Sequence, residues 1–196
     1  MSLTRFLALV STLAILVFAA TGCGGGGDSS SASGTKPETW SADVCGALQT
    51  WEDDLQSGSQ QLSSDMRSSA DLKSVKQKLV AFLQDAEQST EKMLADVKSA
   101  GAPAVNDGPA IQRDLESGLT EARGSFQHAV TQAKKLPANN AETLAAGLSS
   151  LAQRIQSELT ATGNHFSNLD TKYDVGDLNK AMAAEPSCKP FVSSSG

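Results

Sequence analysis

Aromatic residues are scarce in this chain of 196 residues. They make up 5% of it, and all apolar residues together make up 39%. A β-sheet depends on Val, Ile, Tyr, Phe and Thr, whereas much of this chain is Ala, Ser, Leu, Gln, Lys, Asp and Glu. Such a composition is poorly suited to a sheet and favours helices with narrow apolar stripes.

Basic residues are also fewer than acidic residues. The chain has 16 Lys and Arg against 22 Asp and Glu, which gives a formal net charge of −6. One of the 16, Arg5, lies in the first 22 residues, which contain no acid, so the rest of the chain carries 15 basic and 22 acidic residues. Nucleic acids and anionic lipid surfaces are bound through basic surfaces. The balance therefore argues against nucleic acid as a partner and against broad adsorption on anionic lipid headgroups.

The motifs of common catalytic and metal sites are missing. The sequence has no G-x-S-x-G, H-E-x-x-H or C-x-x-C. His128 and His165 lack the Glu three positions earlier that a helical Glu-x-x-His metal site uses, because Ser125 and Thr162 stand there. The acidic turn 170–177 has Lys and Val where a calcium-binding EF-hand loop needs an acid or amide and a glycine. We therefore expect no catalytic residue, no metal and no cofactor, and predict that the protein is not an enzyme.

Long hydrophobic runs are absent apart from one near the N-terminus. This run extends from Phe6 to Ala20, follows Arg5 and is followed by small residues. That order is the plan of a secretory signal peptide. The alternative is a membrane-spanning helix, but about 20 residues are needed to span a bilayer, and no basic stop-transfer cluster follows. The sequence predicts a signal peptide over residues 1–22.

Cysteine occurs three times, and the first occurrence directly follows the signal-like segment. Ala20-Thr21-Gly22-Cys23 resembles the bacterial lipobox, with Ala in place of the usual Leu. The resemblance implies that a diacylglyceryl group modifies Cys23, that the signal peptide is cut before it, and that its new amine receives a further acyl chain such as palmitate. Two or three acyl chains hold a protein on a bilayer where one does not. A plain signal peptide cut elsewhere, leaving Cys23 free, is the alternative.

Residues 23–38 are rich in Gly and Ser. Segments of this kind behave as flexible coil, and about 15 such residues have an r.m.s. reach of about 20 Å. No strand precedes the run of glycines at 24–27 and no helix begins in it, so it does not have the pattern of a phosphate-binding loop. We interpret 23–38 as the lipidated Cys and its tether.

Cys45 and Cys188 remain as a pair in a chain that is predicted to be exported. Export leads to an oxidising compartment, where two cysteines pair by default. A catalytic redox pair would more often be C-x-x-C, and a metal site would need further ligands close by. The sequence predicts a structural Cys45–Cys188 disulfide.

Apolar residues recur at helical spacing in four long segments, 40–66, 72–97, 111–133 and 144–169. A shorter helix is predicted around Leu178 and Met182. Short loops join the segments, which favours an all-α, four-helix up-down bundle over residues 39–191, with a short C-terminal helix and a disordered tail at 192–196. Trp40 and Trp51 fall on the first apolar stripe, so we expect them in the core rather than in a ligand pocket.

Side chains that accept hydrogen bonds from backbone amides stand where several of these helices are expected to begin. Ser41 is the predicted N-cap of the first helix, Ser69 or Asp71 of the second, and Asn140 of the fourth. Pro109 is expected in the first turn of the third helix.

The lipobox at Cys23, the early segment WSADVCGAL and the late segment AAEPSCKPF together resemble the uncharacterised small helical lipoproteins and secreted proteins of actinobacteria. The resemblance extends over about residues 20–191 and brings no activity and no functional residues with it. It implies a place at the outer, extracytoplasmic face of the cell membrane, held there by the lipid anchor.

Two functions fit these features. The first is a membrane-anchored, non-catalytic binding module whose partner is a cell-envelope protein or a small ligand. The second is a carrier of a small molecule or lipid, held between helices whose many small residues leave room for it.

Overall fold

The structure is a computed structural model that describes residues 33–69 and 71–192. The predicted signal peptide, Cys23, most of the tether and the tail lie outside these residues. Within them the regular elements are helical, and the sole β-type pairing is an isolated bridge between Thr35 and Pro103. The predicted all-α class is confirmed.

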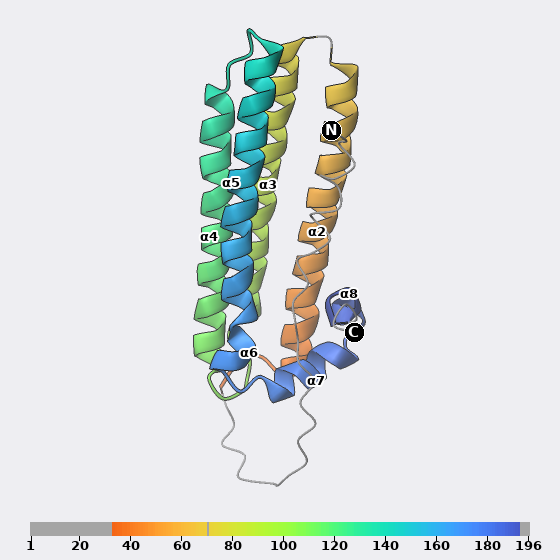
Figure 1. Cartoon of the computed structure of the whole chain (residues 1–196). Coiled ribbons are helices and arrows are strands. Elements are labelled where there is room, and N and C mark those ends of the chain that lie inside the picture. The colour runs from red at the N-terminus through yellow and green to blue at the C-terminus, as the bar shows by residue number, and fades with distance from the viewer. Residues whose placement is uncertain (1–32, 70, 193–196) are drawn as a thin grey trace.

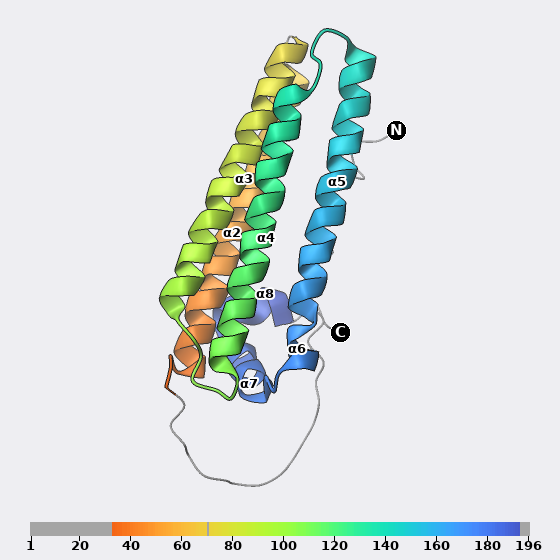
Figure 2. The same cartoon turned by 90° about the vertical axis from the view of Figure 1, so that its left-hand side faces the viewer.

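Four long helices form the main part of the molecule and lie side by side as a helical bundle (Figures 1 and 2). Helix α3 packs against both α2 and α4, and α4 packs against α5, so neighbours in sequence are neighbours in space. Their bounds are α2 Pro37–Ser68, α3 Leu72–Ala100, α4 Gly108–Lys135 and α5 Ala141–Ser167.

Short elements follow α5 and fold back onto the bundle. They are α6 Leu169–Lys172, α7 Gly176–Ala184, the 3-10 turn η2 Pro186–Cys188 and α8 Lys189–Val192. Both α7 and η2 pack against α2. Helix α7 is the predicted short helix around Leu178 and Met182, whereas α6, η2 and α8 have no apolar periodicity that could have predicted them.

Side-chain caps begin two of the long helices. The carboxylate of Asp71 accepts hydrogen bonds from the backbone N–H groups of Lys73 and Ser74, at 2.8 and 2.9 Å. The side chain of Asn140 accepts from the two corresponding N–H groups at the start of α5, at 2.8 and 3.1 Å. These bonds satisfy amide groups that have no partner within the helix. Asp71, rather than Ser69, is therefore the cap of α3, and the predicted cap Asn140 is confirmed.

The predicted N-cap Ser41 is wrong. Helix α2 begins four residues earlier, at Pro37. Proline suits the first helical position because its fixed φ is already helical and its missing N–H is not needed there. Ser41 lies inside the helix and is fully buried, with its backbone oxygen 3.5 Å from Cys188 Sγ. Its small size allows the C-terminal segment to approach α2 closely.

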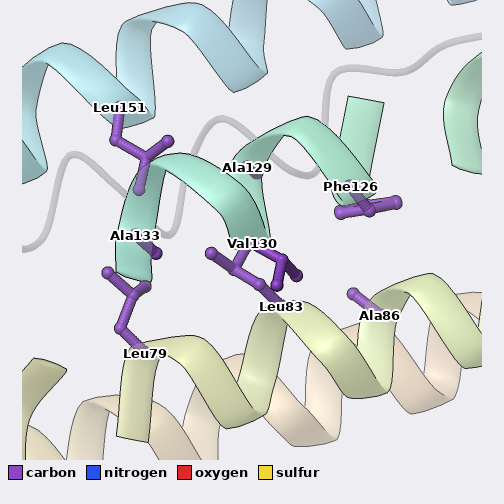
Figure 3. Packing of buried hydrophobic residues seen from close by; sticks show 8 residues of the cluster. All are labelled: Leu79, Leu83, Ala86, Phe126, Ala129, Val130, Ala133 and Leu151. Atoms are coloured by element: carbon purple, nitrogen blue, oxygen red, sulfur yellow. The ribbon is translucent and has the colours of Figure 1, made fainter. Parts of the chain in front are cut away.

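The largest core cluster joins α3, α4 and α5 (Figure 3). Alanines on α4 keep the distance between the helices short, while Leu and Phe side chains fill the space between them. A buried hydrocarbon side chain of this size stabilises the fold by about 1.5–3 kcal/mol. The buried members of the cluster are Leu79, Leu83, Ala86, Phe126, Ala129, Val130, Ala133 and Leu151.

Both tryptophans pack on the core, as expected. Trp40 is 4% exposed, and its indole N–H donates to the backbone oxygen of Gly101 at 2.9 Å. Trp51 donates to the hydroxyl of the fully buried Thr90 at 2.9 Å, and Thr90 in turn donates to the backbone oxygen of Ala86 at 2.7 Å. Each buried polar group on this path thus has a partner, which removes the cost of burying it.

Helices α2 and α5 are not among the pairs that pack closely. Several apolar side chains of these two helices are only partly buried, although they lie against the same core cluster. We call this strip the open seam; it consists of Leu55 and Leu62 on α2 and Leu148, Ile155 and Leu159 on α5.

Candidate functional site

The predicted disulfide joins the beginning of the helical region to its end. Cys45 on α2 and Cys188 in η2 are bonded across a sequence separation of 143 residues. The two residues are 1% and 0% exposed and pack with Phe191, Leu48 and Met182. The crosslink therefore holds α7, η2 and α8 against the first helix, and the surrounding side chains shield it from solvent.

The segment that leads into α2 is held against the loop between α3 and α4. The Thr35 N–H donates to the backbone oxygen of Ala102 at 2.8 Å, and the Ala104 N–H donates to the Thr35 oxygen at 2.7 Å. The Thr35 hydroxyl also donates to the backbone oxygen of Ala100 at 2.5 Å. The point at which the predicted tether joins the folded body is thus fixed on this loop.

A polar cluster attaches the chain after α5 to the first half of α4. The carboxylate of Asp114 accepts from Lys172 Nζ at 2.6 Å and from the Tyr173 hydroxyl at 2.9 Å. The hydrogen bond to Asp114 is the main reason that the pKa of Lys172 lies above its ordinary value. No local pattern reveals this cluster, because its members are almost sixty positions apart.

These three attachments gather at one end of the bundle (Figure 1). We call it the tether end; it contains the start of α2, the loop 101–107 and the elements α6 to α8. The opposite end, which we call the far end, contains the end of α2, the start of α3, the end of α4 and the start of α5. The two ends differ in construction, since the disulfide belongs to the tether end.

Two surface depressions offer space for a ligand. One, of about 360 Å³, is formed by α2 and α3 and is lined by Asp54, Leu55, Gly58, Phe82, Asp85, Ala86, Gln88, Ser89 and Lys92. Several of its polar groups already have partners: Ser89 donates to Asp54 at 2.7 Å, and Lys92 pairs with Asp96 at 2.8 Å. The other, of about 330 Å³, lies between the start of α2 and α7.

Groups that could hold a metal ion are not found among residues 33–69 and 71–192, where no three His, Cys, Asp or Glu side chains are suitably placed. His128 is exposed on α4. His165 lies in α5, but its side chain falls outside the described part of the structure.

A carboxylate on α2 makes stability depend on pH in an unusual direction. Partial burial, and then the neighbouring charge of Asp53, raise the pKa of Glu52. A raised pKa in the folded state means that the folded chain binds more protons than the unfolded chain, so stability falls as the pH rises through this window.

We therefore expect Glu52→Gln to stabilise the protein at neutral pH. The gain should be no more than about 0.5 kcal/mol, because water screens a charge near the surface. It should vanish below the ordinary pKa of Glu, where both chains carry a neutral side chain. Urea unfolding at several pH values measures the difference. Asp53→Asn removes only the neighbouring charge and should give a smaller gain in stability. If the effect of Glu52→Gln did not change with pH, the raised pKa of Glu52 would be refuted.

The part of the chain that the structure describes contains no helix with the length and apolarity needed to cross a bilayer. Comparison of the chain with models of protein families, with curated proteins and with solved structures finds no match.

Proposed function

We propose that this protein is a lipid-anchored, extracytoplasmic binding module without catalytic activity. The observation that carries the proposal is the attachment of Thr35 to the loop 101–107 at the tether end. A tether from Cys23 that enters there would leave the far end and the sides of the helices accessible to a partner. The buried Cys45–Cys188 disulfide also suits a compartment outside the cytoplasm, where thiols are oxidised.

We further propose that α2 to α5 form a four-helix up-down bundle, and that the chain is related to the small helical lipoproteins and secreted proteins of actinobacteria that its sequence resembles. The sequential packing of α2 on α3, α3 on α4 and α4 on α5 supports this topology. Short connections between antiparallel neighbours are typical of it.

Intact mass spectrometry of the protein extracted from its own membrane tests the anchor. We expect a polypeptide that begins at Cys23, carries a diacylglyceryl group with a further acyl chain, and is two hydrogens lighter than the reduced chain. Cys23→Ser is the matched control, because it removes the acylated thiol but leaves the helical body untouched. An unacylated chain that is recovered from the culture fluid would contradict the proposal.

In-cell crosslinking tests the binding role separately. A module with a defined surface should yield the same crosslinked partner repeatedly, and failure to recover a repeatable partner would count against the role. The crosslink reports only that two proteins lie close together, so this test does not depend on whether the protein is an enzyme.

A carrier function is the second candidate, and the open seam is the observation that favours it. Half-buried Leu and Ile side chains of α2 and α5 pack against the same filled core. An apolar ligand seated there would cover them and gain the free energy of their burial. Native mass spectrometry should then show a ligand that co-purifies with the protein, or an increase in the mass of the protein after incubation with lipid extracts. Ile155→Gln should reduce the fraction of protein that carries the ligand. The absence of any bound mass under both conditions would exclude this candidate.

A further inference from the structure

Basic residues gather at the far end of an otherwise acidic molecule. Residues 65–78 and 133–145 form this end and contain three acids, Asp65, Asp71 and Glu142. The middle of the bundle has the opposite balance, since residues 52–54, 85–96 and 116–123 carry nine acidic and two basic side chains. The basic residues of the far end are Arg67, Lys73, Lys76, Lys78, Lys134 and Lys135.

Helix dipoles explain only part of this arrangement. Lys134 and Lys135 stand in the last turn of α4, and Arg67 in the last turn of α2, where a cation is favourable. Lys73 stands in the first turn of α3, which holds no acid beyond the cap, and a cation is unfavourable there. Lys73 is thus placed against the local preference.

Tertiary contacts bring these residues to one surface. Lys76 Nζ donates to the backbone oxygen of Leu136 at 2.9 Å, so the start of α3 adjoins the end of α4. Lys78 pairs with Asp65 at 3.2 Å, which links the start of α3 to the end of α2. These two lysines serve as bridges between elements.

The other four cations point to solvent. Arg67, Lys73, Lys134 and Lys135 are exposed, and the described residues provide no ion pair for them. The charge of Lys73 does act on Asp71, whose pKa is lowered mainly by the hydrogen bond from the Ser74 N–H. Four exposed cations therefore remain at the far end to meet an external anion.

We propose that the far end binds a linear, phosphate-bearing polyanion of the cell envelope. The proposal rests on the binding role proposed above and names its partner. The acidic middle of the bundle repels such a polymer, so the molecule is oriented with its far end toward it. The net charge of the whole chain argues against polyanions, but it does not show that acidic and basic residues are separated along the bundle.

The chemistry of the surface favours phosphate over an apolar protein partner. Protein interfaces are enriched in aromatic residues and Arg and depleted of Lys. The far end has the reverse composition, because five of its six cations are Lys and residues 65–78 and 133–145 contain no aromatic side chain. Lysine binds phosphate as a point charge and needs no fixed geometry.

The length of the bundle separates this surface from the membrane. Helix α4 has 28 residues, which span about 42 Å at 1.5 Å per residue. A body held at its tether end thus presents the far end at a distance from the lipid. An envelope polymer can reach the far end at that distance, whereas the lipid headgroups cannot.

Binding of a fluorescent linear polyphosphate to the full chain, purified in non-ionic detergent with its disulfide intact, tests the proposal. We expect Lys134→Glu/Lys135→Glu to weaken binding by about tenfold or more, because opposed charges replace two of four contacts. The matched control is Lys180→Glu/Lys189→Glu, which changes the net charge equally at the tether end and should alter the affinity less than about twofold. Equal losses in both variants would overturn the proposal.

Salt dependence provides a second readout. Four phosphate contacts predict a loss of affinity of about 50-fold between about 50 and 200 mM salt, and two contacts a loss of about 7-fold. Lys134→Gln/Lys135→Gln, which avoids placing acids at a helix C-terminus, should show the shallower dependence. Loss of the two favourable cations should lower the stability of the fold by no more than about 2 kcal/mol, so the variant stays folded under the conditions of the binding measurement. An equal dependence in wild type and variant would refute the far end as the site.

Competing partners give distinct outcomes. Binding to polyglutamate as strong as to polyphosphate, or binding to anionic phospholipid vesicles without binding to polyphosphate, would overturn the phosphate polymer as the partner. These results are independent of the proposed lipid anchor, because polyphosphate binding is measured in solution and does not require acylation. The chain could therefore prove to be unacylated and still bind polyphosphate.

Discussion

Joint replacement of Cys45 and Cys188 by Ala should lower the melting temperature by about 10–20 °C. The disulfide closes a loop of 143 residues, and restriction of so long a loop in the unfolded chain contributes about 5 kcal/mol in the chain-entropy model. A domain of this size loses about 2–4 °C per kcal/mol. Replacing both residues avoids leaving a single reactive thiol. Circular dichroism during heating measures the change.

Reduction of the wild-type chain should reproduce this loss. The released C-terminal elements α7, η2 and α8 should then exchange their amide hydrogens faster than the long helices, since the crosslink holds them on α2. Cys23→Ala is the matched control and should leave the melting temperature unchanged, because it lies outside the helical body. A melting temperature that is insensitive to both reduction and the double replacement would mean that the thiols are not joined.

Gly108→Ala should destabilise the protein by about 1–3 kcal/mol or more. Gly108 is buried at the start of α4, and a Cβ atom there would lie 1.9 Å from the backbone oxygen of Pro103. Backbone cannot yield as a flexible side chain can, so the loop 101–107 would have to move, and such strain commonly costs about 1–3 kcal/mol or more. The same loop holds Thr35, so the start of α2 should loosen as well. Urea unfolding measures the loss.

Gly124→Ala is the matched control, on the same helix and with no atom within 4 Å of the added Cβ. It should stabilise the protein by about 0.5–1 kcal/mol, because Ala is the better helix former. Opposite signs for two identical substitutions on one helix would identify the loop contact as the cause. If Gly108→Ala were as harmless as Gly124→Ala, the close approach of Pro103 to α4 would be disproved.

Local patterns were sufficient for the four long helices and for several of their ends. Apolar residues at spacings of three and four mark one helical face whatever the partner helix is. Asp71 and Asn140 act as caps through amide groups only two and three positions away, so their role was also predictable. Ser41 failed as a cap because Pro37 starts the helix earlier and the disulfide region buries Ser41.

Contacts between distant residues were beyond such patterns. Lys172 and Tyr173 reach Asp114 only because the chain after α5 turns toward the first half of α4, and nothing near Asp114 in the sequence signals this contact. The same holds for the far end, where Lys73 and Lys134 lie about sixty positions apart. The spacing of residues within one helix does not reveal which charged residues of three different helices lie on the same surface.

The amino-acid sequence alone was enough to predict the helical class and the pairing of Cys45 with Cys188, both of which the structure contains. Lipid attachment at Cys23 stays a prediction of the sequence. These depend on composition, on local spacing and on the number of cysteines. The packing of the helices decided which residues share an end, where Thr35 is attached and how acidic and basic surfaces are separated. The physical reason is that hydrophobic periodicity acts within one helix, whereas the arrangement of charges in space depends on which helices pack together and in what direction.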